Sequence, residues 1–203
     1  MLFRASLARP GGNVTGLSEP YAGIHTKILG LVRETLPKVT RVAFLMDLTL
    51  GPTLIRTRDA LQAAAPSLAL TIQTVEFRGA AEFERAVQAV ARARAGALIV
   101  PGSTYAANGR RIAEVAMKTR MPVFSIAPVV ESYFGLLAYG PDFLDMHQRA
   151  ATYVDKILKG AQPADIPVQQ PAKFNLIVNL KTARQLGIAV PAIVLHQATK
   201  VIE

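Results

Sequence analysis

The sequence predicts an α/β fold, with a mainly parallel sheet flanked by helices, on the basis of two observations. Between residues 41 and 126, short β-rich runs alternate with longer stretches that have the hydrophobic periodicity of helices. The connections between these runs are short, as in sheets whose strands are joined through packed helices. An alternating order of this kind requires parallel strands with helices on both faces of the sheet.

This central region contains four predicted strands and three predicted helices. Apolar residues of the second helix fall on one face, and the second strand alternates apolar and polar residues. The strands are Arg41–Met46, Leu70–Glu76, Ala97–Val100 and Pro122–Ile126, and the helices are Pro52–Ala65, Ala80–Arg94 and Ala106–Thr119. We expect a sheet of five or six strands centred on this region.

The flanking segments are not expected to continue the same sheet. They contain strand-like runs and helices with clear boundary signals, such as Asp142 as an N-cap and Gly187 after a short helix. The run Pro191–Leu195 is apolar and has the length of a strand. The predicted flanking strands are Asn13–Ser18, Leu136–Tyr139 and Phe174–Asn179, and the predicted helices are Ile24–Leu36, Asp142–Leu158 and Lys181–Gln185.

Composition indicates a globular protein with a sizeable core. Of the 203 residues, 51% are hydrophobic and 18% are charged, which leaves little room for disorder. No stretch approaches the roughly 20 apolar residues that a membrane helix needs. The sequence has no cysteine, so disulfides and thiolate chemistry are excluded. The first residues lack the apolar core of a signal peptide.

A formal net charge of +9 raises the question of nucleic-acid binding. The basic residues are scattered along the sequence, and Arg110 and Arg111 are the one adjacent pair. No aromatic residues are interleaved with them as stacking platforms for bases. We therefore expect a solvated basic surface and no nucleic-acid partner.

The search for catalytic and metal-binding patterns is negative. His25, His147 and His196 are isolated from one another and from acidic clusters, so each is expected at the surface or partly buried. Gly102-Ser-Thr lacks the second glycine of a nucleophile elbow. Pro10-Gly-Gly-Asn precedes a predicted strand, where a dinucleotide fingerprint would follow one. The sequence therefore predicts neither an enzyme nor a cofactor or metal site.

Five segments, taken in order, resemble the ABC-transporter substrate-binding family that includes the tryptophan- and tyrosine-binding proteins. They cover nearly the whole chain, although no one of them is decisive. The segments are Leu7-Ala-Arg-Pro-Gly-Gly-Asn-Val-Thr-Gly-Leu-Ser18, Glu34-Thr-Leu-Pro-Lys-Val-Thr-Arg-Val-Ala43, Arg110-Arg-Ile-Ala-Glu114 with Met121-Pro-Val123, Ala138-Tyr-Gly-Pro-Asp142 with Ala151-Thr-Tyr-Val-Asp-Lys-Ile-Leu-Lys-Gly160, and Lys173-Phe-Asn-Leu-Ile-Val-Asn-Leu-Lys-Thr-Ala183 with Leu186-Gly-Ile188.

This resemblance implies a type I periplasmic-binding-protein fold, in which two α/β lobes joined by three crossovers hold a ligand in the cleft. It implies that the sequence contains the second lobe and a remnant of an incomplete, N-terminally truncated first lobe. It also implies a periplasmic or cell-envelope location. The implied division is a first-lobe remnant with a crossover at 1–20, the second lobe at 21–132, a crossover with a first-lobe helix at 133–165, and a return to the second lobe at 166–203.

Candidate ligand-binding residues follow the carboxyl ends of the predicted strands, where open α/β sheets bind ligands. Backbone amides of the helices that start there favour an anionic group. Each candidate has a structural alternative: a turn cap for Asp47 and a helix cap for Ser103 and Thr104. Packing at the rim is the alternative for Tyr105. The full set is Asp47, Thr49, Ser103, Thr104, Tyr105 and Ser125.

The function that the resemblance implies is capture of a small organic solute, an amino acid or a related acid, for delivery to an ABC permease. The alternative is a ligand-sensing regulatory module of the same fold. Helix Asp142–Leu158 carries apolar residues at spacings of three and four, an apolar stripe that the missing part of the first lobe would cover. If the stripe is left bare, we expect a homodimer formed through this helix.

Overall fold

The computed structural model describes residues 6–18, 21–127 and 135–203. The chain divides into two compact units, and it passes between them three times. Unit 1 comprises residues 1–20 and 141–174, and unit 2 comprises residues 21–140 and 175–203. The assignment of these units to lobes remains a prediction, and each unit is described by itself.

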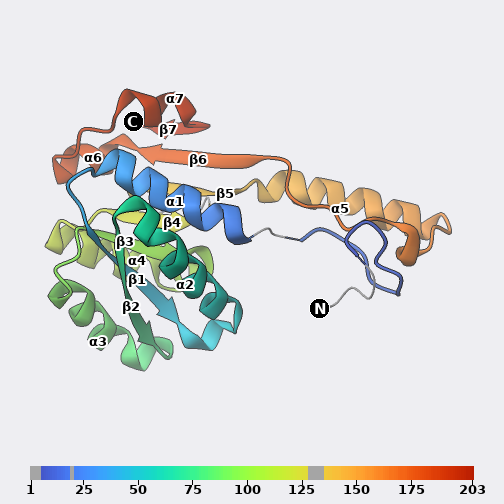
Figure 1. Cartoon of the computed structure of the whole chain (residues 1–203), viewed down its shortest axis with the longest axis horizontal. Coiled ribbons are helices and arrows are strands. Elements are labelled where there is room, and N and C mark those ends of the chain that lie inside the picture. The colour runs from blue at the N-terminus through green and yellow to red at the C-terminus, as the bar shows by residue number, and fades with distance from the viewer. Residues whose placement is uncertain (1–5, 19–20, 128–134) are drawn as a thin grey trace. The chain divides into compact units, whose positions relative to one another are not determined.

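A seven-stranded sheet has the order β2-β1-β3-β4-β5-β6-β7 (Figure 1). All the helices and strands predicted between residues 41 and 126 are present, which confirms the α/β fold class. The strands are β1 (Arg41–Asp47), β2 (Thr71–Phe77), β3 (Ala97–Pro101), β4 (Val123–Ile126), β5 (Leu137–Pro141), β6 (Phe174–Asn179) and β7 (Lys200–Ile202).

The first five strands of the chain pair in parallel, and so do β6 and β7. Between β5 and β6 the direction reverses. Asn179 N donates to Leu136 O at 2.9 Å and Asp142 N donates to Lys173 O at 3.0 Å, so residue numbers rise along one strand as they fall along the other. The expectation that the flanks leave the sheet was wrong, because β5, β6 and β7 extend it to seven strands.

Helices cover both faces of the sheet in unit 2. One core cluster joins Phe44, Ile99 and Phe124 of the strands to side chains of α1, α2, α6 and α7. The other joins Leu45 and Val100 to α3 and α4. These helices are α1 (Tyr21–Thr35), α2 (Thr53–Ala64), α3 (Gly79–Arg92), α4 (Gly102–Thr119), α6 (Leu180–Leu186) and α7 (Ala192–Gln197); short 3-10 helices are η1 (Leu48–Leu50) and η2 (Ala65–Leu68).

The C-terminal elements differ in part from the expectation. Pro191–Leu195 has the length of a strand, but α7 begins at Ala192, directly after Pro191, whose fixed φ suits a helix start. The short strand β7, which follows α7, carried too weak a pattern to be predicted. Gly187 ends α6 at φ 70°, in the left-handed conformation that favours glycine.

Unit 1 is built around one long helix, α5 (Phe143–Leu158), together with the 3-10 helix η4 (Pro163–Asp165). The predicted N-cap is confirmed: the Asp142 carboxylate accepts a hydrogen bond from Asp145 N. The predicted strand Asn13–Ser18 was wrong, because this segment forms only the bridge between Leu17 and Gln169. Among the described residues, no helix is long and apolar enough to cross a membrane.

Candidate functional site

Parallel pairing brings the carboxyl ends of β1, β3 and β4 to one edge of the sheet. Phe44 lies opposite Ile99, and Val100 lies opposite Ser125. Continuing that register places Asp47 level with the start of α4 and the end of β4. The loops after these strands, which carry the candidate ligand-binding residues, therefore share the carboxyl edge of unit 2.

Asp47 is the last residue of β1 and is almost fully buried. Its Oδ1 accepts hydrogen bonds from Thr49 N at 3.0 Å, Thr49 Oγ1 at 2.7 Å and Gly79 N at 3.2 Å. Burial acts to raise the pKa of Asp47, but the hydrogen bonds from Thr49 and Gly79 outweigh it and lower the pKa. Asp47 is thus an ionised carboxylate that holds the turn after β1 and the start of α3.

Helix α4 begins at Gly102, four residues before its predicted start at Ala106. A Cβ at Gly102 would lie 2.5 Å from Ala127 Cβ and 3.0 Å from Ile126 O, so only glycine allows this approach to the end of β4. Pro101 occupies the N-cap position and provides no side-chain hydrogen bond. The first-turn amides of α4 therefore lack a side-chain cap among the described residues.

The first turn of α4 contains three of the candidates in different environments. Ser103 is exposed, whereas Thr104 and Tyr105 are fully buried. Thr104 Oγ1 has no hydrogen-bond partner among the described residues. The helix-cap interpretation of Ser103 and Thr104 was wrong, because both lie inside the helix and no capping bond is formed.

Ser125 lies inside β4 and is fully buried. Its neighbour Val123, two residues earlier and therefore on the same face, belongs to the core beneath α3 and α4. Ser125 Oγ has no hydrogen-bond partner within the described part of the chain. Of the six candidates, Thr49 and Ser103 are the two with exposed side chains.

Two glycines of this edge were missed as site residues. Gly79 donates its N–H to Asp47 with a φ of 64°, and Gly102 permits the contact between α4 and β4. Gly102 directly follows β3, and Gly79 follows β2 after one intervening residue. A glycine just after a predicted strand is therefore a usable sequence signal. Neither has a side chain, so the search for chemical groups passed over them.

The three histidines do not form a catalytic or metal-binding group. His147 and His196 are exposed, and His147 Nδ1 lies 2.6 Å from Phe143 O. The expectation for His25 was wrong: it is 1% exposed in α1, and burial lowers its pKa to about 4. No group of three His, Asp or Glu side chains within residues 6–18, 21–127 and 135–203 is placed to hold a metal ion.

The mainly parallel sheet, helices on both faces and three passages between two units define a type I periplasmic-binding fold. The chain belongs to the ABC transporter substrate-binding protein family, whose model matches residues 3–202. That family binds solutes and is not an enzyme class. Among curated proteins, no significant match to this sequence is found.

Solved structures of similar proteins support this assignment. A Streptococcus pneumoniae ABC domain in complex with L-Trp is 27% identical, with a TM-score of 0.86 over 99% of this chain and 68% of its own. A conserved domain protein from Vibrio cholerae is 26% identical, with a TM-score of 0.87 over 97% of this chain and 65% of its own. The present chain thus spans about two thirds of the length of these relatives.

The same fold occurs in regulatory proteins. A LacI family transcriptional regulator from Bifidobacterium animalis has a TM-score of 0.63 over 80% of this chain and 62% of its own. At 14% identity, this likeness concerns the fold alone.

Proposed function

We propose that this chain binds a small organic solute, an amino acid or a related acid, at the carboxyl edge of unit 2. The proposal rests on one observation: exposed Thr49 and Ser103 lie at that edge, together with the first turn of α4, which has no side-chain cap among the described residues. Family membership supports solute binding as the activity. The L-Trp bound to the Streptococcus pneumoniae relative supports an amino acid as the ligand class.

The ligand carboxylate is assigned to the N-terminal turn of α4. Backbone amides of a helix N-terminus point outward and carry the positive end of the helix dipole, so they favour an anion. The Ser103 hydroxyl lies in the same turn, and the Thr49 hydroxyl lies in the neighbouring loop. Asp47, Thr104, Tyr105 and Ser125 are buried around this turn, and we propose that they hold its shape beneath the ligand.

In this proposal the chain performs binding without catalysis, and its partner is an ABC permease in the cell envelope. Unit 2 corresponds to the second lobe of the family fold, and unit 1 belongs to the first. The regulatory alternative is supported by likeness of fold alone, whereas the substrate-binding family model matches residues 3–202. We therefore favour solute transport, with a periplasmic or cell-envelope location.

The test is binding of a panel of amino acids and small carboxylic acids, measured by calorimetry on the wild-type chain and two variants. Ser103→Ala and Thr49→Val are expected to weaken binding by roughly 3–10-fold each. Ser103→Ala removes one ligand hydrogen bond, and Thr49→Val removes one together with the bond from Thr49 Oγ1 to Asp47 Oδ1. Ser67→Ala, an exposed serine of η2, is the matched control and should bind as the wild type does. Unchanged affinity in both site variants would contradict this location for the ligand.

We further propose that unit 1 forms a homodimer through α5. Five large apolar side chains of this helix are exposed, and Leu158 and Leu144 are the most open at 82% and 69%. Ala150 and Ala151 lie between the large residues at the two ends, so an antiparallel second copy can approach closely at the centre. The exposed set is Phe143, Leu144, Val154, Ile157 and Leu158.

Burial of apolar surface favours a second copy as the partner of this face. Burying a large apolar side chain contributes roughly 1.5–3 kcal/mol, and a symmetric pair buries this set twice. That gain offsets an association cost of roughly 4–15 kcal/mol.

Analytical ultracentrifugation at micromolar concentration tests the dimer. The double variant Leu144→Gln/Leu158→Gln is expected to be monomeric. Ile55→Gln/Ile193→Gln, which changes two exposed isoleucines of unit 2, should leave the dimer intact. A wild-type chain that sediments as a monomer would rule out this role for α5.

A further inference from the structure

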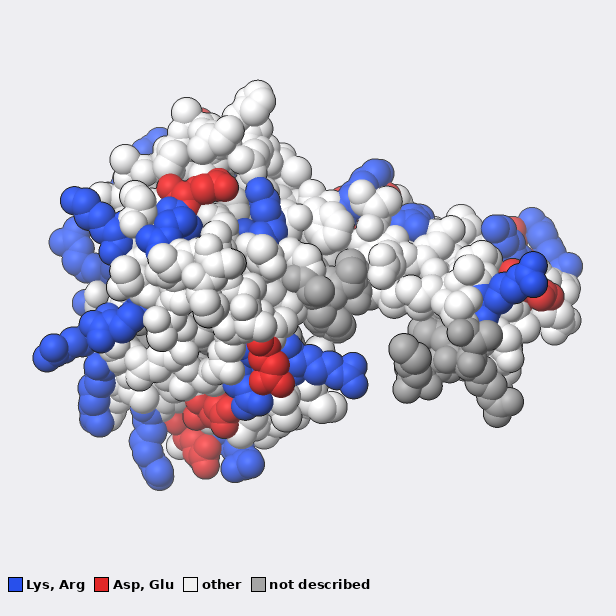
Figure 2. Space-filling model, in the orientation of Figure 1, with Lys and Arg blue, Asp and Glu red and all other residues white. Residues whose placement is uncertain are grey.

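Eight exposed Lys and Arg side chains gather at the amino edge of the sheet in unit 2, opposite the candidate ligand site. In a sheet of parallel strands joined by helices, strand starts and helix ends meet at this edge. Figure 2 shows blue side chains along the left margin of unit 2, with the red ones lying further inward. This basic edge comprises Lys38, Arg41, Arg92, Arg94, Lys118, Arg120, Lys181 and Arg184.

Backbone hydrogen bonds hold several of these segments together. Arg41 is the first residue of β1, and its carbonyl accepts from Gly96 N at 2.9 Å, just after Arg94. Leu98 N donates to Pro122 O at 2.9 Å, which ties β3 to the segment that follows Arg120. Cations that are distant in sequence are thereby brought to neighbouring strand starts.

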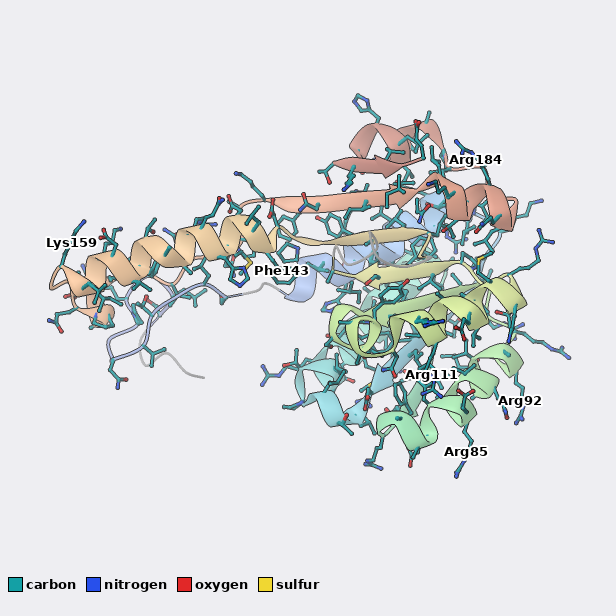
Figure 3. All side chains as sticks on the ribbon, turned by 180° about the vertical axis from the view of Figure 1, so that it is seen from behind. Arg85, Arg92, Arg111, Phe143, Lys159 and Arg184 are labelled. Carbon is teal, nitrogen blue, oxygen red and sulfur yellow. The ribbon has the colours of Figure 1, made fainter. Side chains whose placement is uncertain are left out.

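Helix α6 joins the same edge because β6 runs against the first five strands and ends there. A Cβ at Gly187, which ends α6, would lie 4.0 Å from a guanidinium nitrogen of Arg120. The C-termini of α4 and α6 are therefore adjacent. In Figure 3, which shows the reverse side, Arg184 and Arg92 both lie toward the same margin of unit 2.

The charges of the basic edge are largely uncompensated. None of the eight side chains forms an ion pair with a described residue. Among the described residues, the acidic ones at this edge are Glu34, at the end of α1, and Glu203, after β7. Elsewhere in unit 2, Arg58 pairs with Glu76 at 3.1 Å and Arg111 pairs with Glu84.

Unpaired like charges repel one another, so a concentrated basic edge favours a partner that carries many negative charges. We propose that this edge binds the anionic headgroup surface of a lipid bilayer. Its cations stand on separate loops and helix ends, and none of the eight has an aromatic neighbour in sequence that could stack on a base. A bilayer surface requires only several accessible cations on one side of the protein.

The test is co-sedimentation of the whole chain with phosphatidylglycerol–phosphatidylcholine vesicles, against vesicles of phosphatidylcholine alone. Binding should require phosphatidylglycerol and weaken as salt is added, because salt screens exposed charges. Each cation near an anionic surface contributes about fivefold to binding, so Arg41→Gln/Arg92→Gln/Lys118→Gln should lose roughly 100-fold. Circular dichroism confirms that each variant is folded.

The matched control is Arg56→Gln/Arg78→Gln/Arg110→Gln, which removes the same charge from exposed positions of unit 2 outside the basic edge. It should retain most of the binding. Equal loss in both triple variants would overturn the proposal, because net charge alone would then explain the attraction. A DNA duplex that binds more tightly than the vesicles through the same three residues would also overturn it, by showing that nucleic acid is the partner.

Discussion

The two units differ in how completely they bury their apolar side chains. Unit 2 buries Phe44, Ile99 and Phe124 of its central strands completely between two layers of helices. In unit 1, Tyr153 is the one buried side chain of α5, while Leu144 and Leu158 are largely exposed. The same helical spacing of apolar residues in the sequence thus corresponds to a buried helix face in unit 2 and to an exposed helix face in unit 1.

The difference shows that hydrophobic periodicity identifies the apolar face of a helix, but not which element packs against that face. In unit 2, α2, α3 and α4 are neighbours in sequence of the strands that they cover, as in every β-α-β unit, and α6 and α7 complete one layer. In unit 1 the described partners of α5 are short segments, and the Tyr153 hydroxyl donates to Pro167 O at 2.6 Å. The stability of unit 2 is therefore expected to depend on extensive packing, and that of unit 1 on a few hydrogen bonds and a few buried side chains such as Ile166 and Val168.

The largest effect is expected from a pair of matched phenylalanine substitutions. Phe44→Ala removes a fully buried ring from β1 and should lower the free energy of unfolding by about 3–5 kcal/mol. Phe143→Ala, made in the monomeric Leu144→Gln/Leu158→Gln background, changes a ring of α5 that is 38% exposed and should cost less than about 1 kcal/mol. Urea denaturation measures both. Equal losses would show that the two units share one kind of core.

The buried histidine of unit 2 should make its stability depend on pH. Burial lowers the pKa of His25 from 6.5 to about 4, so between these values the unfolded chain binds a proton that the folded chain does not. Stability should fall by up to about 3 kcal/mol as pH drops through this window. His25→Leu should flatten the dependence, whereas His147→Gln, at an exposed position, should not. An unchanged slope in His25→Leu would contradict the assignment.

A smaller and local effect is expected in unit 1. Tyr153→Phe removes the hydrogen bond to Pro167 O and should cost about 1 kcal/mol. Amide hydrogen exchange should accelerate in α5 and residues 163–169 while unit 2 keeps its protection. Acceleration spread evenly over both units would show that they unfold together.

The smallest effect is expected at the core of unit 2. Ser125→Ala removes a fully buried hydroxyl that has no partner among the described residues, so the free energy of unfolding should stay within about 1 kcal/mol of the wild type or rise. Thermal denaturation checks this. A loss above about 2 kcal/mol would reveal a hydrogen bond that this arrangement does not contain.

Most of the fold could be predicted because it rests on local patterns. The alternation in residues 41–126 and the Asp142 cap act over a few residues, and both are confirmed. The seventh strand and the reversed direction of β6 depend on pairing between distant segments, which periodicity does not encode. The basic edge could not be predicted for the same reason, because pairing between distant segments brings together basic residues that are scattered along the sequence.

The position of the candidate residues in the sheet could be predicted from the sequence, whereas the burial of their side chains could not. Register alone brings Asp47, Ser103 and Ser125 to one region of the sheet. Burial could not be predicted from residue type, because Tyr105 of α4 and Ser125 of β4 both carry hydroxyl groups yet are fully buried. Gly102 was missed because it contributes by lacking a side chain, which allows the close contact between α4 and the end of β4.

The proposed ligand site is the carboxyl edge of unit 2. Titration of the isotope-labelled chain with L-tryptophan and with a panel of other amino acids, followed by amide chemical shifts, tests it most directly. We expect at least one ligand to cause saturable shifts concentrated in residues 47–51 and 102–105. Saturable shifts confined to other segments, or no shifts with any ligand up to its solubility limit, would contradict the claim.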